Sequence, residues 1–254
     1  MPDLIRHPAS SSPLRRKAAG PRIKSGVTEY LIVSDHAPIP DEAETRARWG
    51  DFAWTPENAA KAKEIIGRYP PGRQQSASIP FLDLAQRQVG AATQTQGWLP
   101  VPVIEFVARE LGMPYMRVYE VASFYTMFNL APVGRYHVQV CGTTPCMLAG
   151  SDDVFAACKN HGLIKGKTTP DGLFTLTEVE CLGTCANAPM VQINDDNFED
   201  LDYDRMTKVL EALARGKAPT PGSQIGRQTS CPEGGPTSLK DMVTENHDYR
   251  GEWA

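Results

Sequence analysis

The sequence predicts an α+β fold, in which a small helical bundle precedes a compact α/β layer and a disordered tail lies at each end. Apolar residues recur at helical spacing in the first half, whereas strand-like and helix-like segments follow one another in the second half. Proline and glycine gather toward the two ends. The predicted boundaries are 1–50 for a basic N-terminal tail, 51–130 for the helical bundle, 131–216 for the α/β domain and 217–254 for a Pro/Gly-rich C-terminal tail.

The N-terminal tail has the composition of a segment that does not fold by itself. Its first 34 residues carry six Lys or Arg side chains against two acidic ones, and a serine triplet occupies 10–12. A mitochondrial transit peptide has a similar composition, but it needs an amphipathic helix, which several prolines would interrupt here. A solvated tail, or one that contacts a partner, is therefore the preferred interpretation.

Four helices are expected in the bundle. Thr55 followed by Pro56 and Glu57 is typical of a helix N-terminus, with proline at the first helical position. Apolar spacing and terminating glycines place the helices over about 55–67, from about Ser78 to Val89, over 102–111 and over 114–127. Their apolar stripes indicate a hydrophobic core.

The second half is expected to form strand, helix, strand, strand and helix in that order. Alternating residues favour a strand over 136–141, and later strands are expected over 172–179 and 190–194. One helix is predicted from Cys146 to His161. Asp204 is the expected cap of the last helix, which Gly216 would end.

Four of the six cysteines form two pairs, Cys141 with Cys146 and Cys181 with Cys185. Four residues separate the first pair and three separate the second. Each pair is expected where a strand ends and a loop begins, because a loop lets two thiolates turn toward one point. Two such loops at the same end of neighbouring strands would hold four sulfur atoms in one cage.

Zinc, an iron–sulfur cluster and two disulfides are the alternatives for this cage. Structural zinc usually takes shorter spacings, whereas a loop with four intervening residues occurs in plant-type ferredoxins. The spacing therefore favours a 2Fe-2S cluster and leaves zinc open, while disulfides suit a chain without a secretory signal least. Cys158 is expected to be buried and inert in a helix, and Cys231 has no partner at a suitable spacing.

Several segments are highly specific when taken together. They are GRYHVQVC and TTPC at 134–146, TPDGLFTL, EVECLG and CANAP at 169–189, and upstream motifs at 97–98, 111–114 and 118–128. From about Phe52 to Gly216 the chain resembles the NuoE-type small iron–sulfur subunit of respiratory complex I (NADH:quinone oxidoreductase). The resemblance implies a thioredoxin-like α/β ferredoxin domain behind the helical bundle. It also implies one 2Fe-2S cluster held by Cys141, Cys146, Cys181 and Cys185.

The resemblance further implies an electron-transfer subunit, whose cluster exchanges single electrons with the FMN of a partner that binds NADH. A neighbouring iron–sulfur subunit is the second implied partner. The chain would belong to an enzyme, a translocase, without a substrate site of its own, because it lacks both a G-x-G-x-x-G motif and the P-loop spacing. The alternatives are the equivalent diaphorase subunit of an NAD-linked hydrogenase or formate dehydrogenase, and a zinc-binding interaction module.

Composition argues against two other classes of protein. A formal net charge of −4 gives no overall basic surface for nucleic acid. No stretch approaches the ~18 consecutive apolar residues of a membrane span. We therefore expect a peripheral subunit on the cytoplasmic side of a bacterial inner membrane, with the mitochondrial matrix as the alternative.

Overall fold

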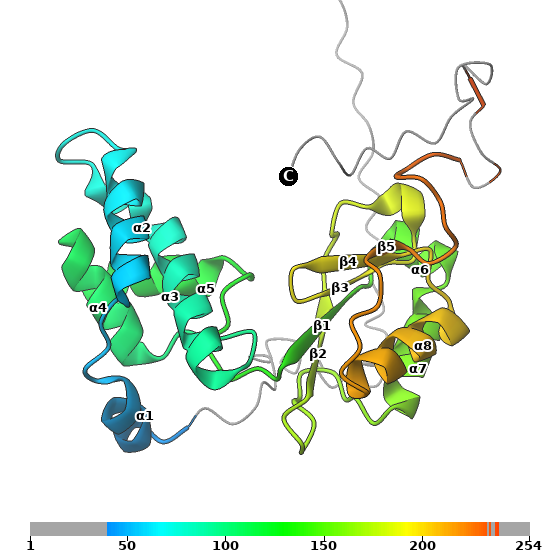
Figure 1. Ribbon diagram of the computed structural model, residues 1–254, viewed down its shortest axis with the longest axis horizontal. Helices are drawn as coiled ribbons and strands as arrows, with labels where there is room; N and C mark the ends of the chain where they lie inside the picture. Colours follow the sequence, from blue (N-terminus) through cyan, green and yellow to red (C-terminus); the bar gives the residue numbers. More distant parts are fainter. Residues whose placement is uncertain (1–39, 233, 235–236, 239–254) are drawn as a thin grey trace, which may run out of the picture. The chain divides into compact units, whose positions relative to one another are not determined.

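The structure is a computed structural model, and it describes residues 40–232, 234 and 237–238. The predictions made for 1–39 and for the last residues from 239 onward lie outside the described residues. Figure 1 shows helices in the first half of the described chain and a mixed arrangement of strands and helices in the second half. This order agrees with the predicted α+β fold.

The first half of the described residues consists of helices that share one hydrophobic core. In chain order they are α1 (Glu42–Trp49), α2 (Pro56–Gly67), the 3₁₀ turn η2 (Gln74–Ala77), α3 (Ser78–Thr93), α4 (Val101–Leu111) and α5 (Tyr115–Phe124). Phe81, Ile104 and Val118 are fully buried in this core. Thr55 caps α2, since its side chain accepts a hydrogen bond of 3.3 Å from the N–H of Asn58. The four expected helices are confirmed, with ends that differ by a few residues.

Helix α1 lies inside the range 1–50 that composition assigned to the N-terminal tail, so that prediction is wrong for residues 42–49. The helix escaped notice because Thr45 is its buried side chain and no apolar stripe marks it. Charge supports it instead: acidic residues occupy the first turn and basic residues the last, which complements the helix dipole. Arg46 also pairs with Glu42 at 3.0 Å and with Glu105 of α4 at 3.1 Å.

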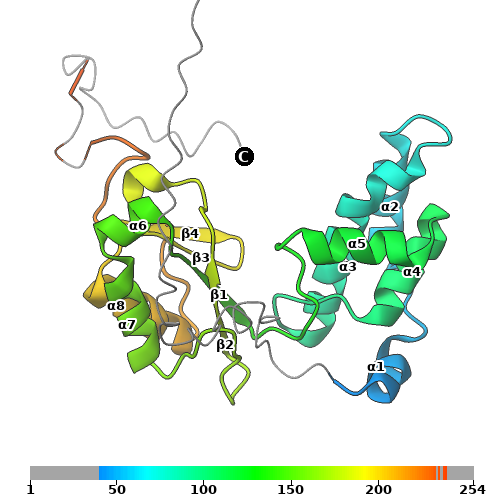
Figure 2. The ribbon, with the colours of Figure 1, turned by 180° about the vertical axis from the view of Figure 1, so that it is seen from behind.

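The second half contains one mixed sheet with the strand order β2-β1-β3-β4-β5. Its strands are β1 (Tyr136–Cys141), β2 (Phe174–Val179), β3 (Val191–Ile193), β4 (Asp196–Glu199) and β5 (Gly222–Ser223). Strand β1 is parallel to β2 and antiparallel to β3, and β4 is parallel to β5. The predicted strands are therefore confirmed, and Figure 2 shows them from behind.

Two helices pack against each other beside this sheet, α7 (Ser151–Asn160) and α8 (Tyr203–Ala214), and α7 also contacts β1. Their apolar side chains join those of the strands in a second hydrophobic core. Burial of Val154, Met206 and Leu210 against Val138 and Val191 holds the helices to the sheet. The core thus fixes β1 and β3, and the first cysteine loop begins at the end of β1.

The single helix predicted from Cys146 to His161 is wrong, because the structure has two helices there. Helix α6 (Thr144–Ala149) ends at Gly150, and α7 begins directly after it. Gly150 adopts φ 106° and ψ 33°, a left-handed conformation that glycine accepts readily and that ends a helix. Cys146 consequently lies in the first turns of a short, separate helix.

The last helix is capped by Asp202, so the prediction of Asp204 as its cap is wrong. The backbone of Asp202 is extended, and its side chain accepts a hydrogen bond of 2.8 Å from the N–H of Arg205. This is the geometry that an N-cap requires. Asp204 lies in the first turn of α8, where its negative charge interacts favourably with the helix dipole.

Part of the predicted C-terminal tail is also ordered. Strand β5 lies within 217–254 and pairs with β4, so the prediction of disorder is wrong at least for Gly222–Ser223. Composition misled here because the segment is held through backbone pairing and a few polar side chains, which a count of prolines and glycines does not register.

The cap of α8 can be tested directly. Asp202→Ala is expected to lower the free energy of unfolding by about 1 kcal/mol, because the N–H of Arg205 loses its acceptor. Asp204→Ala should lower it by about 0.3 kcal/mol, since only a favourable charge near the helix N-terminus is removed. Urea denaturation followed by circular dichroism measures both. Equal losses for the two variants would contradict the assignment of the cap.

Candidate metal centre

The pairing of β1 with β2 places both cysteine loops at one edge of the sheet. The two strands are parallel, and Cys141, the last residue of β1, lies opposite Val179, the last residue of β2. Cys181 follows two residues later. Because the two parallel strands end level with each other, the loops that leave them start side by side.

The first pair of cysteines is buried. Cys141 and Cys146 are each 1% exposed, the first at the end of β1 and the second in α6. Thr143 lies between them, and its hydroxyl is 3.2 Å from the sulfur of Cys141. The strand, the threonine and the short helix together hold this pair in place.

The second pair of cysteines is exposed. Cys181 and Cys185 have their sulfur atoms 3.5 Å apart, and the N–H of Gly183 points at the sulfur of Cys181 at 3.4 Å. Gly183 has φ 87°, so the loop turns through a left-handed residue between the two cysteines. Cys185 then opens the single 3₁₀ turn η3 (Cys185–Asn187).

The two pairs meet in one region. The backbone of Leu182, in the second loop, helps to lower the pKa of Cys141 in the first, so the two residues lie close together. Leu182 also packs against a small apolar cluster formed by Cys141, Cys146 and Met190. Cys185 interacts electrostatically with both cysteines of the first pair. The structure thus brings together the four cysteines that the sequence singled out.

The surroundings of these thiols shift their pKa values in different directions. Burial opposes ionisation of Cys141, but hydrogen bonds from Thr143 and from the N–H of Leu182 outweigh it and lower the pKa of that thiol. Burial raises the pKa of Cys146 to about 11. The hydrogen bond to Cys181 raises the pKa of Cys185. Metal binds the thiolate form of cysteine, so its binding here would release protons, those of Cys146 and Cys185 among them.

The donor set fits an iron–sulfur cluster better than a single ion. All four donors are free cysteine thiols, a soft set that suits zinc or iron–sulfur chemistry. A binuclear cluster is wider than a single ion and takes two thiolates on each iron, which suits a set of donors that comes as two pairs.

The other candidate ligands have different roles. Cys158 is fully buried in the second hydrophobic core, and burial raises the pKa of its thiol to about 12. His137 contacts Thr177 at 2.9 Å, and His161 contacts the carbonyl of Ala157 at 3.1 Å. Cys231 is partly buried and lies on the C-terminal segment. The sequence analysis had placed the two cysteines, Cys158 and Cys231, outside the cage.

Sequence reasoning missed the groups that support the cysteines. Thr143 could have been noticed from its position two residues after Cys141. The N–H of Leu182 and the backbone of Met190 carry no signal in the side-chain pattern, since their contribution depends on the meeting of two distant loops. Arg227, which contacts the second loop, lies 42 residues beyond Cys185 and had no visible link to it.

Known proteins share this region. The family described as thioredoxin-like [2Fe-2S] ferredoxin matches residues 62–214, more than half of the chain. An NADH-quinone oxidoreductase subunit from Rickettsia conorii (strain ATCC VR-613 / Malish 7) is 57% identical over 164 residues, which are 64% of this chain and 95% of that relative. The protein of the same description from Rickettsia bellii (strain RML369-C) is 54% identical over 164 residues, with the same coverage. The thioredoxin-like fold expected from the sequence is thereby confirmed.

Solved structures were matched as well. The air-oxidized NAD⁺-reducing [NiFe]-hydrogenase aligns with a TM-score of 0.43 and 22% identity, over 52% of this chain and 23% of that chain.

The burial of the thiols predicts their order of alkylation in the metal-free chain. Cys181 and Cys185 should react with iodoacetamide well before Cys158, which is fully buried. Peptide mass spectrometry after brief exposure measures each site, and the urea-unfolded chain, in which all six thiols should react, is the control. Modification of Cys158 as fast as that of Cys181 would show that the second core is not packed as described.

Proposed function

Because this chain belongs to the thioredoxin-like [2Fe-2S] ferredoxin family, we propose that it is the electron-transfer subunit of an NADH–quinone oxidoreductase. The family match confirms the expected cofactor, one 2Fe-2S cluster. The two Rickettsia relatives reported above, both NADH-quinone oxidoreductase subunits, support the assignment of the complex. Such a complex is an oxidoreductase, and this chain is one part of it.

The ligands that we propose for the cluster are Cys141, Cys146, Cys181 and Cys185. The observation that carries this assignment is the contact between the loops, in which Leu182 beside Cys181 packs against the cluster of Cys141, Cys146 and Met190. Cys158 is enclosed in the second core and does not belong to the cluster of Cys141, Cys146 and Met190. The bound cluster would supply one-electron chemistry, accepting or giving a single electron at a time.

The unequal exposure of the pairs suggests how electrons would enter and leave. Cys141 and Cys146 are buried by the protein, whereas Cys181 and Cys185 face outward. A partner could therefore bring its redox group up to the second pair without opening the fold. The backbone N–H of Gly183 donates to the sulfur of Cys181 on this side and would stabilise negative charge there.

The proposed electron donor is the FMN of a partner subunit that binds NADH, and a neighbouring iron–sulfur subunit is the second proposed partner. The sequence has neither a dinucleotide fingerprint nor a P-loop, which leaves NADH and FMN to another chain. Among the described residues, none of the helices is both long and apolar enough to cross a bilayer. We place the chain at the periphery of its complex, on the cytoplasmic side of a bacterial inner membrane or, alternatively, in a mitochondrial matrix.

The diaphorase subunit of an NAD-linked hydrogenase or formate dehydrogenase is the alternative that the sequence left open. The identities of 57% and 54% are to quinone-reducing relatives, which favours the respiratory complex. Identification of the subunits that purify with the native chain decides between these assignments. A hydrogenase or formate dehydrogenase subunit among them would refute the proposed complex.

The ligand assignment predicts a sharp division among cysteine variants. Each of Cys141→Ala, Cys146→Ala, Cys181→Ala and Cys185→Ala should lose the EPR signal of the dithionite-reduced cluster, because each removes one of its four thiolates. Cys158→Ala is the matched control and should keep the signal together with about two irons per chain.

Two results would contradict this assignment. A colourless wild-type chain that binds zinc stoichiometrically, without iron or sulfide, would restore the zinc-binding module. Loss of the EPR signal in Cys158→Ala, with the full signal kept in Cys185→Ala, would show that the cluster is held elsewhere.

A further inference from the structure

The C-terminal residues 217–231, here called the C-terminal strap, fold back onto the sheet. They lie beyond the residues that the family matches, which end at 214. After α8 the strap contributes β5, which pairs with β4 at the edge of the sheet. The hydroxyl of Ser223 then donates a hydrogen bond of 2.6 Å to the carboxylate of Asp200.

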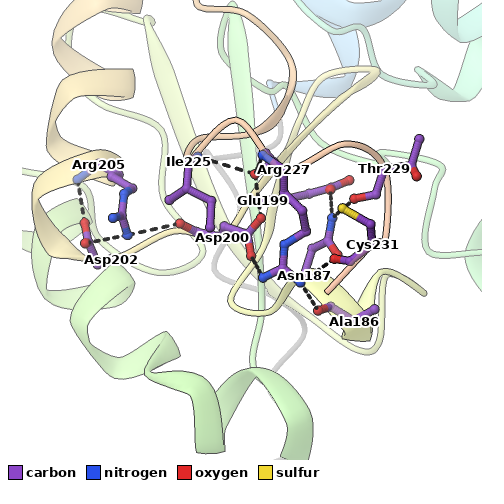
Figure 3. A network of polar contacts seen from close by, with 11 residues as sticks. Ala186, Asn187, Glu199, Asp200, Asp202, Arg205, Ile225, Arg227, Thr229 and Cys231 are labelled. Atoms are coloured by element: carbon purple, nitrogen blue, oxygen red, sulfur yellow. Dashed lines mark hydrogen bonds and ion pairs between the residues drawn. The ribbon is translucent and has the colours of Figure 1, made fainter. Parts of the chain in front are cut away.

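Arg227 links the strap to the second cysteine loop. One end of its guanidinium forms an ion pair of 2.5 Å with Asp200, and the two side chains are only 12% and 5% exposed. The other end, Nη1, donates to the carbonyl of Ala186 at 3.3 Å and to that of Cys231 at 3.2 Å. Figure 3 shows the guanidinium between these groups. Ala186 is the residue directly after Cys185.

Asn187, the next residue of the loop, is held from several sides. Its side chain is fully buried, and its Nδ2 donates to Glu199 at 2.6 Å and to the carbonyl of Thr229, in the strap, at 2.8 Å. Its own carbonyl accepts a hydrogen bond of 2.8 Å from the N–H of Asp200. The end of η3 is thus fixed between β4 and the strap, as Figure 3 shows.

Apart from the packing of Leu182 against Cys141, Cys146 and Met190, the second loop has little else to hold it. Its two cysteines are exposed, Gly183 is left-handed, and its regular structure is the single turn η3. The first loop differs, because Cys146 is buried within α6 and packed against Met190. The position of Cys185 therefore depends on the anchoring of Ala186 and Asn187.

We infer that Arg227 is a positioning residue, which fixes Cys185 relative to the first cysteine pair by binding the carbonyl of Ala186. The inference rests on the proposed role of Cys185 as a cluster ligand. Asp200 neutralises the charge of Arg227, so the strap acts through hydrogen-bond geometry more than through its electric field. The C-terminal strap is then a structural part of the proposed metal centre.

Arg227→Lys is the test variant, and Arg205→Lys is its matched control. Lysine keeps a positive charge beside Asp200, so no buried carboxylate is left unpaired, but one ammonium cannot reproduce the fork that reaches both Asp200 and the two carbonyls. Arg205 also contacts Asp200, because its guanidinium donates a hydrogen bond of 3.4 Å to the backbone carbonyl of Asp200. It forms an ion pair with Asp202 as well. No contact between Arg205 and residues 185–187 is recorded among the described residues.

The first measurement is amide hydrogen exchange of the full chain without metal. In Arg227→Lys the amides of Asn187 and Asp200 should exchange about tenfold faster, the factor expected on loss of one hydrogen bond to a charged group. The amides of β1 should not change, which shows that the fold is intact. Arg205→Lys should leave the exchange at Asn187 as in the wild type.

The second measurement is EPR of the reduced, cluster-loaded chain. Arg227→Lys should broaden or shift the signal and speed loss of the cluster, and Arg205→Lys should do neither. Exchange at Asn187 that differs by less than about threefold between the variants, together with identical EPR spectra, would overturn the inference. Absence of a cluster in the wild type would instead refute the proposed function, and the exchange measurement would still decide whether the strap anchors the loop.

Discussion

The parallel pairing of β1 with β2 is the constraint on which the rest of the structure depends. Its register sets Cys141 opposite Val179, so that both loops leave the sheet at the same level. A slip of one residue would turn every side chain of one strand to the opposite face of the sheet. Cys141 would then lie on the other face from the one it occupies now. The apolar contacts of Val138 and Val140 in the second core hold this register. The proposed metal centre is thus a consequence of how the sheet is packed.

Much of this arrangement could be read from local sequence. Strand β1 was predicted with its observed ends, and the cysteine pairs were located at strand ends because their spacing and the neighbouring glycines are local features. Other features depend on choices that a pattern leaves open. Asp202 and Asp204 are both suitable caps, and the backbone conformation selects the first. Gly150 separates two helices whose apolar spacing alone suggested one.

The C-terminal strap could not be predicted for a different reason. Its links to the rest of the fold are the pairing of β5 with β4, the hydrogen bond from Ser223 to Asp200 and the ion pair between Asp200 and Arg227, 27 residues apart, together with backbone carbonyls that any residue would offer. Its many prolines and glycines indicated a tail, and by composition alone that was a sound interpretation. A segment of this kind becomes ordered when a few well-placed polar groups are buried together, which composition does not reveal.

The two cysteine pairs meet opposing demands. A site that exchanges electrons with another protein must approach the surface, yet a cluster needs ligands held in fixed positions. The first pair meets the second demand through burial in β1 and α6. The second pair is exposed and is anchored from its inner side, where Asn187 is enclosed by β4 and the strap. Because this anchor binds the residues that follow Cys185 and not the sulfur atoms themselves, the outer side of the loop stays open to a partner. Rigidity and access can therefore coexist in one short loop.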